Sequence, residues 1–107
     1  MRYTFEKAIK YTISAVRASA SIRLIKEHDM KETEVAKSLG IAQAAVSKYI
    51  SGRYSDKIRS LVVIIKMHKL DSRVVKAILL KKDRQEIMKL IDKAASDRGL
   101  VDAAVTN

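Results

Sequence analysis

The chain has 107 residues, with 22 Lys and Arg against 12 Asp and Glu, a net charge of +10 and no cysteine. The absence of cysteine excludes a disulfide, a thiol nucleophile and a thiolate metal site. Residues 1–54 and residues 55–107 each carry a net charge of +5, so the charge belongs to a folded body and not to a tail. A folded domain with this charge is suited to binding a polyanion, most simply nucleic acid. The alternative is that the lysines form a solvated surface with no such partner.

The chain contains no proline and three glycines, which favours one compact, all-α domain over residues 1–107. No apolar run approaches the roughly 20 residues that a membrane span needs. No basic segment followed by an apolar one opens the chain, as it would in a secretory leader. We therefore expect a cytoplasmic protein with no membrane partner.

A long helix is predicted over residues 5–28, with Thr4 as its N-cap. One apolar stripe advances by three or four residues, and Ile22 and Ile25 fall on nearly the opposite side. A helix that is buried on two sides needs two neighbours. We expect one to be the segment that follows, and the other to be either the C-terminal helices or a second copy of the chain. The stripe consists of Phe5, Ile9, Ile13, Val16, Ala20 and Leu24.

Residues 31–53 have the spacing of a helix-turn-helix, in which two short helices cross at a steep angle. Ala36 and Ala45 are small enough to let the helices approach closely. Gly40 stands where the first helix must end in a residue with positive φ. The second, recognition helix is predicted over residues 42–51. The apolar positions that the pair would bury are Val35, Leu39, Ile41, Val46, Tyr49 and Ile50.

The segments Thr33-Glu34-Val35-Ala36, Leu39-Gly40-Ile41 and 43–52 resemble the lambda-repressor-like helix-turn-helix regulators, and most closely a group of small archaeal helix-turn-helix regulators. The likeness extends over residues 9–53, less than half of the chain. It implies a helix-turn-helix core that binds duplex DNA through the recognition helix. Glu32 departs from a family glutamine that donates to a phosphate, and the Thr33 hydroxyl is the candidate for that contact. Ala42 departs from a threonine that caps the recognition helix.

The solvent side of the recognition helix carries most of the predicted DNA-binding residues. Gln43 is the predicted base reader, because its amide can pair with both N6 and N7 of adenine, and the resemblance implies the same role. Ala44 can touch a thymine methyl, while Ser47 and Lys48 can reach bases or phosphates. Cations that follow Gly52 can contact phosphates beside the groove. The predicted set is Thr33, Gln43, Ala44, Ser47, Lys48, Ser51, Arg53 and Lys57.

Residues 55–98 are predicted to form the C-terminal helices. The apolar run 61–65 is rich in β-branched residues, so it could also be a strand that pairs with 73–80 as a wing hairpin. Ser55 as a cap and the helical spacing of the apolar positions favour a helix over residues 55–67.

Two more helix starts follow. Asp71 is expected to cap a helix, and Asp83 with Glu86 has the spacing of a capping box that opens a last helix to about residue 98. Gly99 would end that helix, and residues 100–107 would be frayed. The buried side of the helix after Asp71 is predicted to be Val74, Val75, Ile78 and Leu79.

The helices after Gly52 hold more apolar positions than three small helices can cover. The surplus suggests that the C-terminal helices form a dimer interface. The alternative is a monomer whose C-terminal helices fold back on its own core. The predicted fold is therefore all-α, with a lambda-repressor-like core, a long N-terminal helix and C-terminal dimerisation helices.

The predicted function is a sequence-specific transcriptional regulator that binds double-stranded DNA as a homodimer. A twofold dimer would set two recognition helices about 34 Å apart, one turn of DNA. Two alternatives are a chromatin-type protein that binds duplex DNA with little sequence preference, and a protein-interaction module on a helix-turn-helix scaffold. His28 and His68 stand apart, and we find no catalytic set, metal-ligand spacing or cofactor motif. We expect no enzyme activity, no cofactor and no small-molecule ligand.

Overall fold

The computed structural model describes residues 2–106 of the chain, and side chains from residue 5 onward. Over these residues the fold is all-α, with no strand, so the wing hairpin is excluded and the helix alternative for 55–67 is confirmed. No helix in this range is long and apolar enough to cross a bilayer. The helices are α1 (Arg2–His28), α2 (Glu32–Leu39), α3 (Gln43–Ile50), α4 (Asp56–His68), α5 (Ser72–Leu79), α6 (Arg84–Ala95) and α7 (Arg98–Val105).

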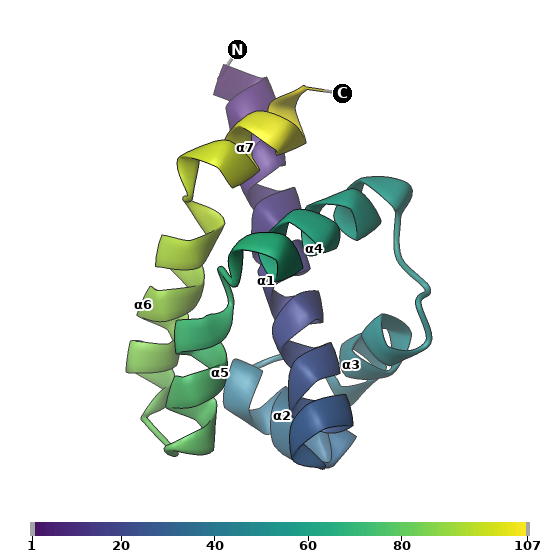
Figure 1. The fold of residues 1–107 in the computed structure, drawn as a ribbon, viewed down its shortest axis with the longest axis vertical. Coiled ribbons are helices and arrows are strands. Elements are labelled where there is room, and N and C mark those ends of the chain that lie inside the picture. Colours follow the sequence, from purple (N-terminus) through teal and green to yellow (C-terminus); the bar gives the residue numbers. More distant parts are fainter. Residues whose placement is uncertain (1, 107) are drawn as a thin grey trace.

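Helix α1 is the central element, and the other helices are arranged around it (Figure 1). The four consecutive positions 18–21, Ala-Ser-Ala-Ser, carry small side chains and are all buried. Small side chains on every side let several helices approach α1 closely. The two neighbours expected from its double stripe are therefore the α2–α3 pair and the C-terminal helices of the same chain, because α4, α6 and α7 all pack on α1.

The start of α1 differs from the prediction. The helix begins at Arg2 and not at Phe5, so Thr4 lies inside it and is not its N-cap. The side chain of Thr4 lies outside the described side chains. Phe5 is 54% exposed, although the stripe predicted it to be buried. Its place near the end of a helix leaves it with fewer neighbours than the central positions have.

The last segment of the chain is a helix, contrary to the frayed end that was predicted. Helix α6 ends at Ala95, and the carboxylate of Asp97 accepts a hydrogen bond from the Leu100 backbone N–H at 3.1 Å, which starts α7. Gly99 lies within α7 and does not end a helix. Leu100 and Ala104 are four residues apart and both are buried, since α7 packs on α1 and α4. A glycine is tolerated there because tertiary packing outweighs its weak helix propensity.

Caps start the other C-terminal helices, with one exception. Ser55 Oγ accepts from the Ile58 N–H at 3.2 Å, and Asp83 accepts from the Glu86 N–H at 2.9 Å, as predicted. In α5, the predicted residues Val74, Val75 and Ile78 are buried, but Leu79 is 41% exposed.

Asp71 precedes α5 but its carboxylate forms no cap. It is fully buried and accepts hydrogen bonds from Ser19 Oγ at 2.7 Å and from Arg23 Nη1 at 2.8 Å, both on α1. A buried carboxylate requires such partners because desolvation of an unpaired charge is very unfavourable. The prediction of a cap was wrong, and the residue instead ties the start of α5 to α1.

Candidate nucleic-acid interface

The turn between α2 and α3 fixes how the two short helices meet. Gly40 ends α2 with φ 70° and ψ 32°, the left-handed conformation predicted for it. The Gly40 N–H donates to the Lys37 carbonyl at 3.3 Å, and the Ile41 N–H donates to the Ala36 carbonyl at 3.0 Å. These bonds satisfy carbonyls that the end of α2 would otherwise leave without partners. The pair is held from inside by buried Val35, Ala36, Leu39 and Val46.

One face of α3 is turned to solvent. Its predicted residues are spaced by three or four positions, so they share one side of the helix. Val46 is buried and Tyr49 half-buried on the other side, where α3 packs on α1 and α2. The residues of the outer face are Gln43, Ala44, Lys48 and Ser51, which are exposed, and Ser47, which is half-buried.

Hydrogen bonds within the chain occupy two of the hydroxyls on this face. Ser47 Oγ donates to Glu32 Oε1 at 2.5 Å, so Glu32 braces α3 against the start of α2. Ser51 Oγ donates to the Ser47 carbonyl at 2.9 Å and accepts from Arg53 Nε at 3.0 Å. Among the residues of the face, Gln43 and Lys48 thus carry polar side-chain groups that bond to no other described residue.

The N-terminus of α3 has no side-chain cap. Ala42 occupies the cap position with φ −70° and ψ 147°, and an alanine side chain has no atom that could accept the amide hydrogens of the first turn. These amides include the N–H groups of Gln43 and Ala44, whereas the Ala45 N–H donates to the Ala42 carbonyl at 3.0 Å. The end of a helix that lacks a cap is electrostatically suited to an anion. Thr33, the other predicted residue nearby, lies exposed in the first turn of α2.

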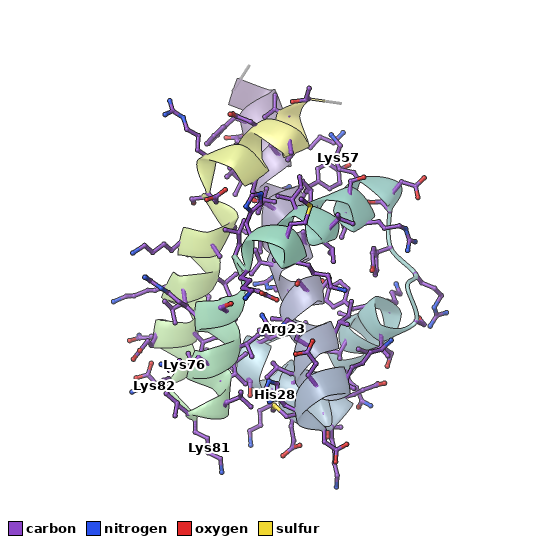
Figure 2. The ribbon with its side chains drawn as sticks, viewed as in Figure 1. Arg23, His28, Lys57, Lys76, Lys81 and Lys82 are labelled. Atoms are coloured by element: carbon purple, nitrogen blue, oxygen red, sulfur yellow. The ribbon has the colours of Figure 1, made fainter. Side chains whose placement is uncertain are left out.

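The two predicted cations that follow α3 lie in different places. Arg53 is exposed beside the end of α3. Lys57 Nζ instead donates to the Ala104 carbonyl at 2.6 Å and lies 5.4 Å from the centre of the Tyr11 ring. Figure 2 shows Lys57 beside α7, so the structure does not bring it to the α3 face.

Arg59 is the second cation beside the loop between α3 and α4, and it was not among the residues predicted from the sequence. Arg59 Nη2 donates to the Gly52 carbonyl at 3.0 Å, and its guanidinium lies 5.0 Å from the centre of the Tyr54 ring. Helical spacing could have identified it. Lys57 is four residues before buried Leu61, whereas Arg59 is four residues before Val63, which is exposed.

The inner side of α3 is anchored by Tyr49. Its ring meets the Tyr54 ring edge to face, with centroids 6.3 Å apart. Burial raises the pKa of Tyr49 above its ordinary value of 10.0, although the charge of Arg17 and a hydrogen bond with Ser14 act in the opposite direction. The phenol is therefore neutral at physiological pH and acts as a packing group.

Among the described residues, no group of three or more His, Cys, Asp or Glu is placed to hold a metal ion. Comparison of the chain with protein-family models, with curated proteins and with solved structures finds no match. What the outer face of α3 binds is therefore inferred from its own geometry and charge.

Proposed function

We propose that the chain is a sequence-specific transcriptional regulator that binds double-stranded DNA as a homodimer, with α3 in the major groove. The observation that carries the proposal is the outer face of α3, which stands exposed behind the Gly40 turn while its inner side is packed. This is the arrangement that a recognition helix needs. The resemblance of residues 9–53 to lambda-repressor-like regulators supports the same assignment.

In this proposal the two ends of α3 have different tasks. Gln43 lies at the N-terminal end with a free amide, and it pairs with an adenine edge in the groove. Arg53 and Arg59 lie at the C-terminal end and contact phosphates, which position the helix without reading sequence. The net charge of +10 provides the long-range attraction that brings the protein to DNA.

The homodimer belongs to the proposal because one eight-residue recognition helix reads few base pairs. Two copies related by a twofold axis would read two half-sites about one DNA turn apart. Most C-terminal apolar positions pack on α1 of the same chain, which is the alternative raised from the sequence. Apolar side chains that stay exposed for a second copy include Val63 and Met67 on α4, at 52% and 70% exposure. Light scattering with and without operator DNA would test the stoichiometry.

A second candidate function, packaging of duplex DNA with little sequence preference, is favoured by a specific observation. Ala42 and Ala44 offer no hydrogen-bonding side chain, and the hydroxyls of Ser47 and Ser51 are bonded within the chain. Only a few groups are then left to read bases. The third candidate, a protein-interaction module, is favoured by the acidic Glu32 at the start of α2, which would repel a phosphate.

The test is fluorescence anisotropy of the chain on duplex DNA from upstream of its own gene and on a scrambled duplex, each at two salt concentrations. We expect tighter binding to the upstream duplex by about 10³-fold or more. Gln43→Ala should reduce that preference by about 1–3 kcal/mol while binding to the scrambled duplex is nearly unchanged. Ser96→Ala, which removes an exposed hydroxyl directly after the end of α6, is the control and should change neither.

The other outcomes separate the candidates. Equal, salt-sensitive binding to both duplexes would favour packaging, or an operator located elsewhere that selection from random sequences would find. An equal loss on both duplexes for Gln43→Ala would show that Gln43 does not read bases. No binding to either duplex at low salt would exclude both DNA functions and leave the interaction module.

A further inference from the structure

A cluster of four cations lies beside α2, outside the set that the sequence singled out. Lys37 of α2, Lys81 and Lys82 of the α5–α6 turn, and Arg84 at the start of α6 line a groove of about 620 Å³. We call them the α2–α6 basic cluster. All four are exposed. Figure 2 shows Lys81 and Lys82 at the end of the molecule opposite to Lys57.

Nearby carboxylates do not neutralise this cluster by ion pairing. Within the described residues, none of the four cations lies within 4.0 Å of a carboxylate oxygen. Glu34 also lines the groove, but its Oε1 accepts from the Lys31 N–H at 3.0 Å. Asp83 stands between the cations in sequence, but its Oδ1 accepts from the Glu86 N–H. Both acids accept hydrogen bonds from backbone amides at helix starts, and none of the four cations forms an ion pair with a described carboxylate.

Arg84 connects the cluster to the turn that precedes α3. Its Nη2 donates to the Lys37 carbonyl at 3.1 Å. Its Nε lies 3.4 Å from the point that a Cβ on Gly40 would occupy, so the guanidinium rests against the turn. Gly40 is two residues before Ala42, a span of at most about 7 Å. Arg84, one member of the cluster, therefore lies beside the turn that leads into α3.

Cations thus stand near both ends of α3. Arg53 and Arg59 lie beside its C-terminal end, and Arg84 of the α2–α6 basic cluster lies beside the turn before its N-terminal end. An eight-residue helix is about 12 Å long, and the major groove is about 12 Å wide. Cations near opposite ends of a helix that enters the groove can contact the two phosphate backbones that border it.

We propose that the α2–α6 basic cluster binds DNA phosphates on the side of the groove opposite to those contacted by Arg53 and Arg59. The proposal rests on the proposed function and extends it. The protein would cover a longer stretch of DNA than α3 by itself could contact. The C-terminal helices α5 and α6 are then part of the DNA-binding surface. The groove also has an apolar floor that includes Ile78 and Ile87, which would suit an acidic peptide instead, and the test separates the two occupants.

The chain offers a matched pair of variants for the test. Lys81 and Lys69 both occupy the left-handed conformation, with φ 57° and 55°, and both are exposed. Lys69 precedes α5 and Lys81 follows it, and the helix between them is about 12 Å long. Glycine accepts this backbone conformation without strain. Lys81→Gly and Lys69→Gly therefore remove the same charge from the same backbone state, and neither should lower the melting temperature.

The measurement is the slope of the logarithm of the duplex-binding constant against the logarithm of the salt concentration. Lys81→Gly should reduce the magnitude of that slope by about 0.9 if it removes one phosphate contact. The double variant Lys81→Gly/Lys82→Ala should reduce it by about twice as much. Lys69→Gly should leave the slope of the wild type unchanged.

A slope for Lys81→Gly that equals those of Lys69→Gly and the wild type would overturn the inference while leaving DNA binding through α3 intact. Binding of a poly-glutamate peptide that Lys81→Gly weakens, without any change in the DNA slope, would assign the groove to an acidic protein. Failure of the wild type itself to bind duplex DNA would remove the proposed function and this inference together.

Discussion

Helices α3 and α7 have the same length, eight residues, and opposite surroundings. Asp97 caps the start of α7, Lys57 bonds the Ala104 carbonyl near its end, and Leu100 is fully buried. Helix α3 begins without a side-chain cap. Of its eight residues, all of them described, Val46 alone is buried. Polar groups that are hydrogen-bonded within the fold, and side chains that are buried in it, are not available to bind a ligand. The open start and exposed face of α3 are therefore where binding is expected, and α7 is where stability is expected.

The largest effect is expected at α7. Leu100→Ala should lower the free energy of unfolding by about 3 kcal/mol, because it empties a fully buried position next to α1. Urea unfolding followed by circular dichroism would measure it. Val105→Ala changes a 43% exposed residue of the same helix and should stay within about 0.5 kcal/mol. A loss below about 1 kcal/mol for Leu100→Ala would indicate that α7 is frayed after all.

Helix caps should give a smaller effect, of opposite sign in the two helices. Asp97→Ala removes the cap of α7 and should cost about 1 kcal/mol of stability. Ala42→Ser adds a hydroxyl at an extended cap position of α3 and should increase stability by up to about 1 kcal/mol. Thermal unfolding of the two variants and of the wild type would measure both changes in stability. Equal changes in the same direction would contradict the contrast between the two helix starts.

The smallest effect concerns the inner side of α3 and appears at alkaline pH. The pKa of Tyr49 is raised by burial, so its neutral form is favoured in the folded state. The resulting stability is complete below pH 10, the ordinary value, and is lost as the pH rises through the raised pKa. Stability of the wild type should therefore fall more steeply above pH 10 than that of Tyr49→Phe. Parallel curves from urea unfolding between pH 9 and pH 11 would show that Tyr49 ionises freely.

Several features of the fold could be predicted because their causes are local. The φ of Gly40 follows from its place between two apolar repeats, and the caps by Ser55 and Asp83 join residues three positions apart. The exposure of Gln43, Ala44 and Lys48 follows from helical spacing, since Val46 and Tyr49 occupy the other side. Local signals of this kind identified the end of α2 and the extent of α3 and α4 to within one or two residues.

Features that join distant residues could not be predicted in the same way. Asp71 has the sequence signature of a cap, yet its partner Ser19 is 52 positions away. Lys57 was predicted to face DNA, and its carbonyl partner is 47 positions away in a helix that was not expected. Arg84 reaches the end of α2 across another 47 positions. No pattern within a few residues of these side chains indicates which distant group each one bonds to.

The amino-acid sequence by itself thus determined that the chain is helical, where the α2–turn–α3 pair lies and which side of α3 stays polar. The reason is that propensity, capping and periodicity act over a few residues. The tertiary structure alone decided that α7 is a helix packed on α1 and α4, that Asp71 is an internal anchor, and that Arg84 lies against the turn before α3. Those outcomes depend on which helices surround α1, and burial against a distant partner leaves no periodic signal of its own.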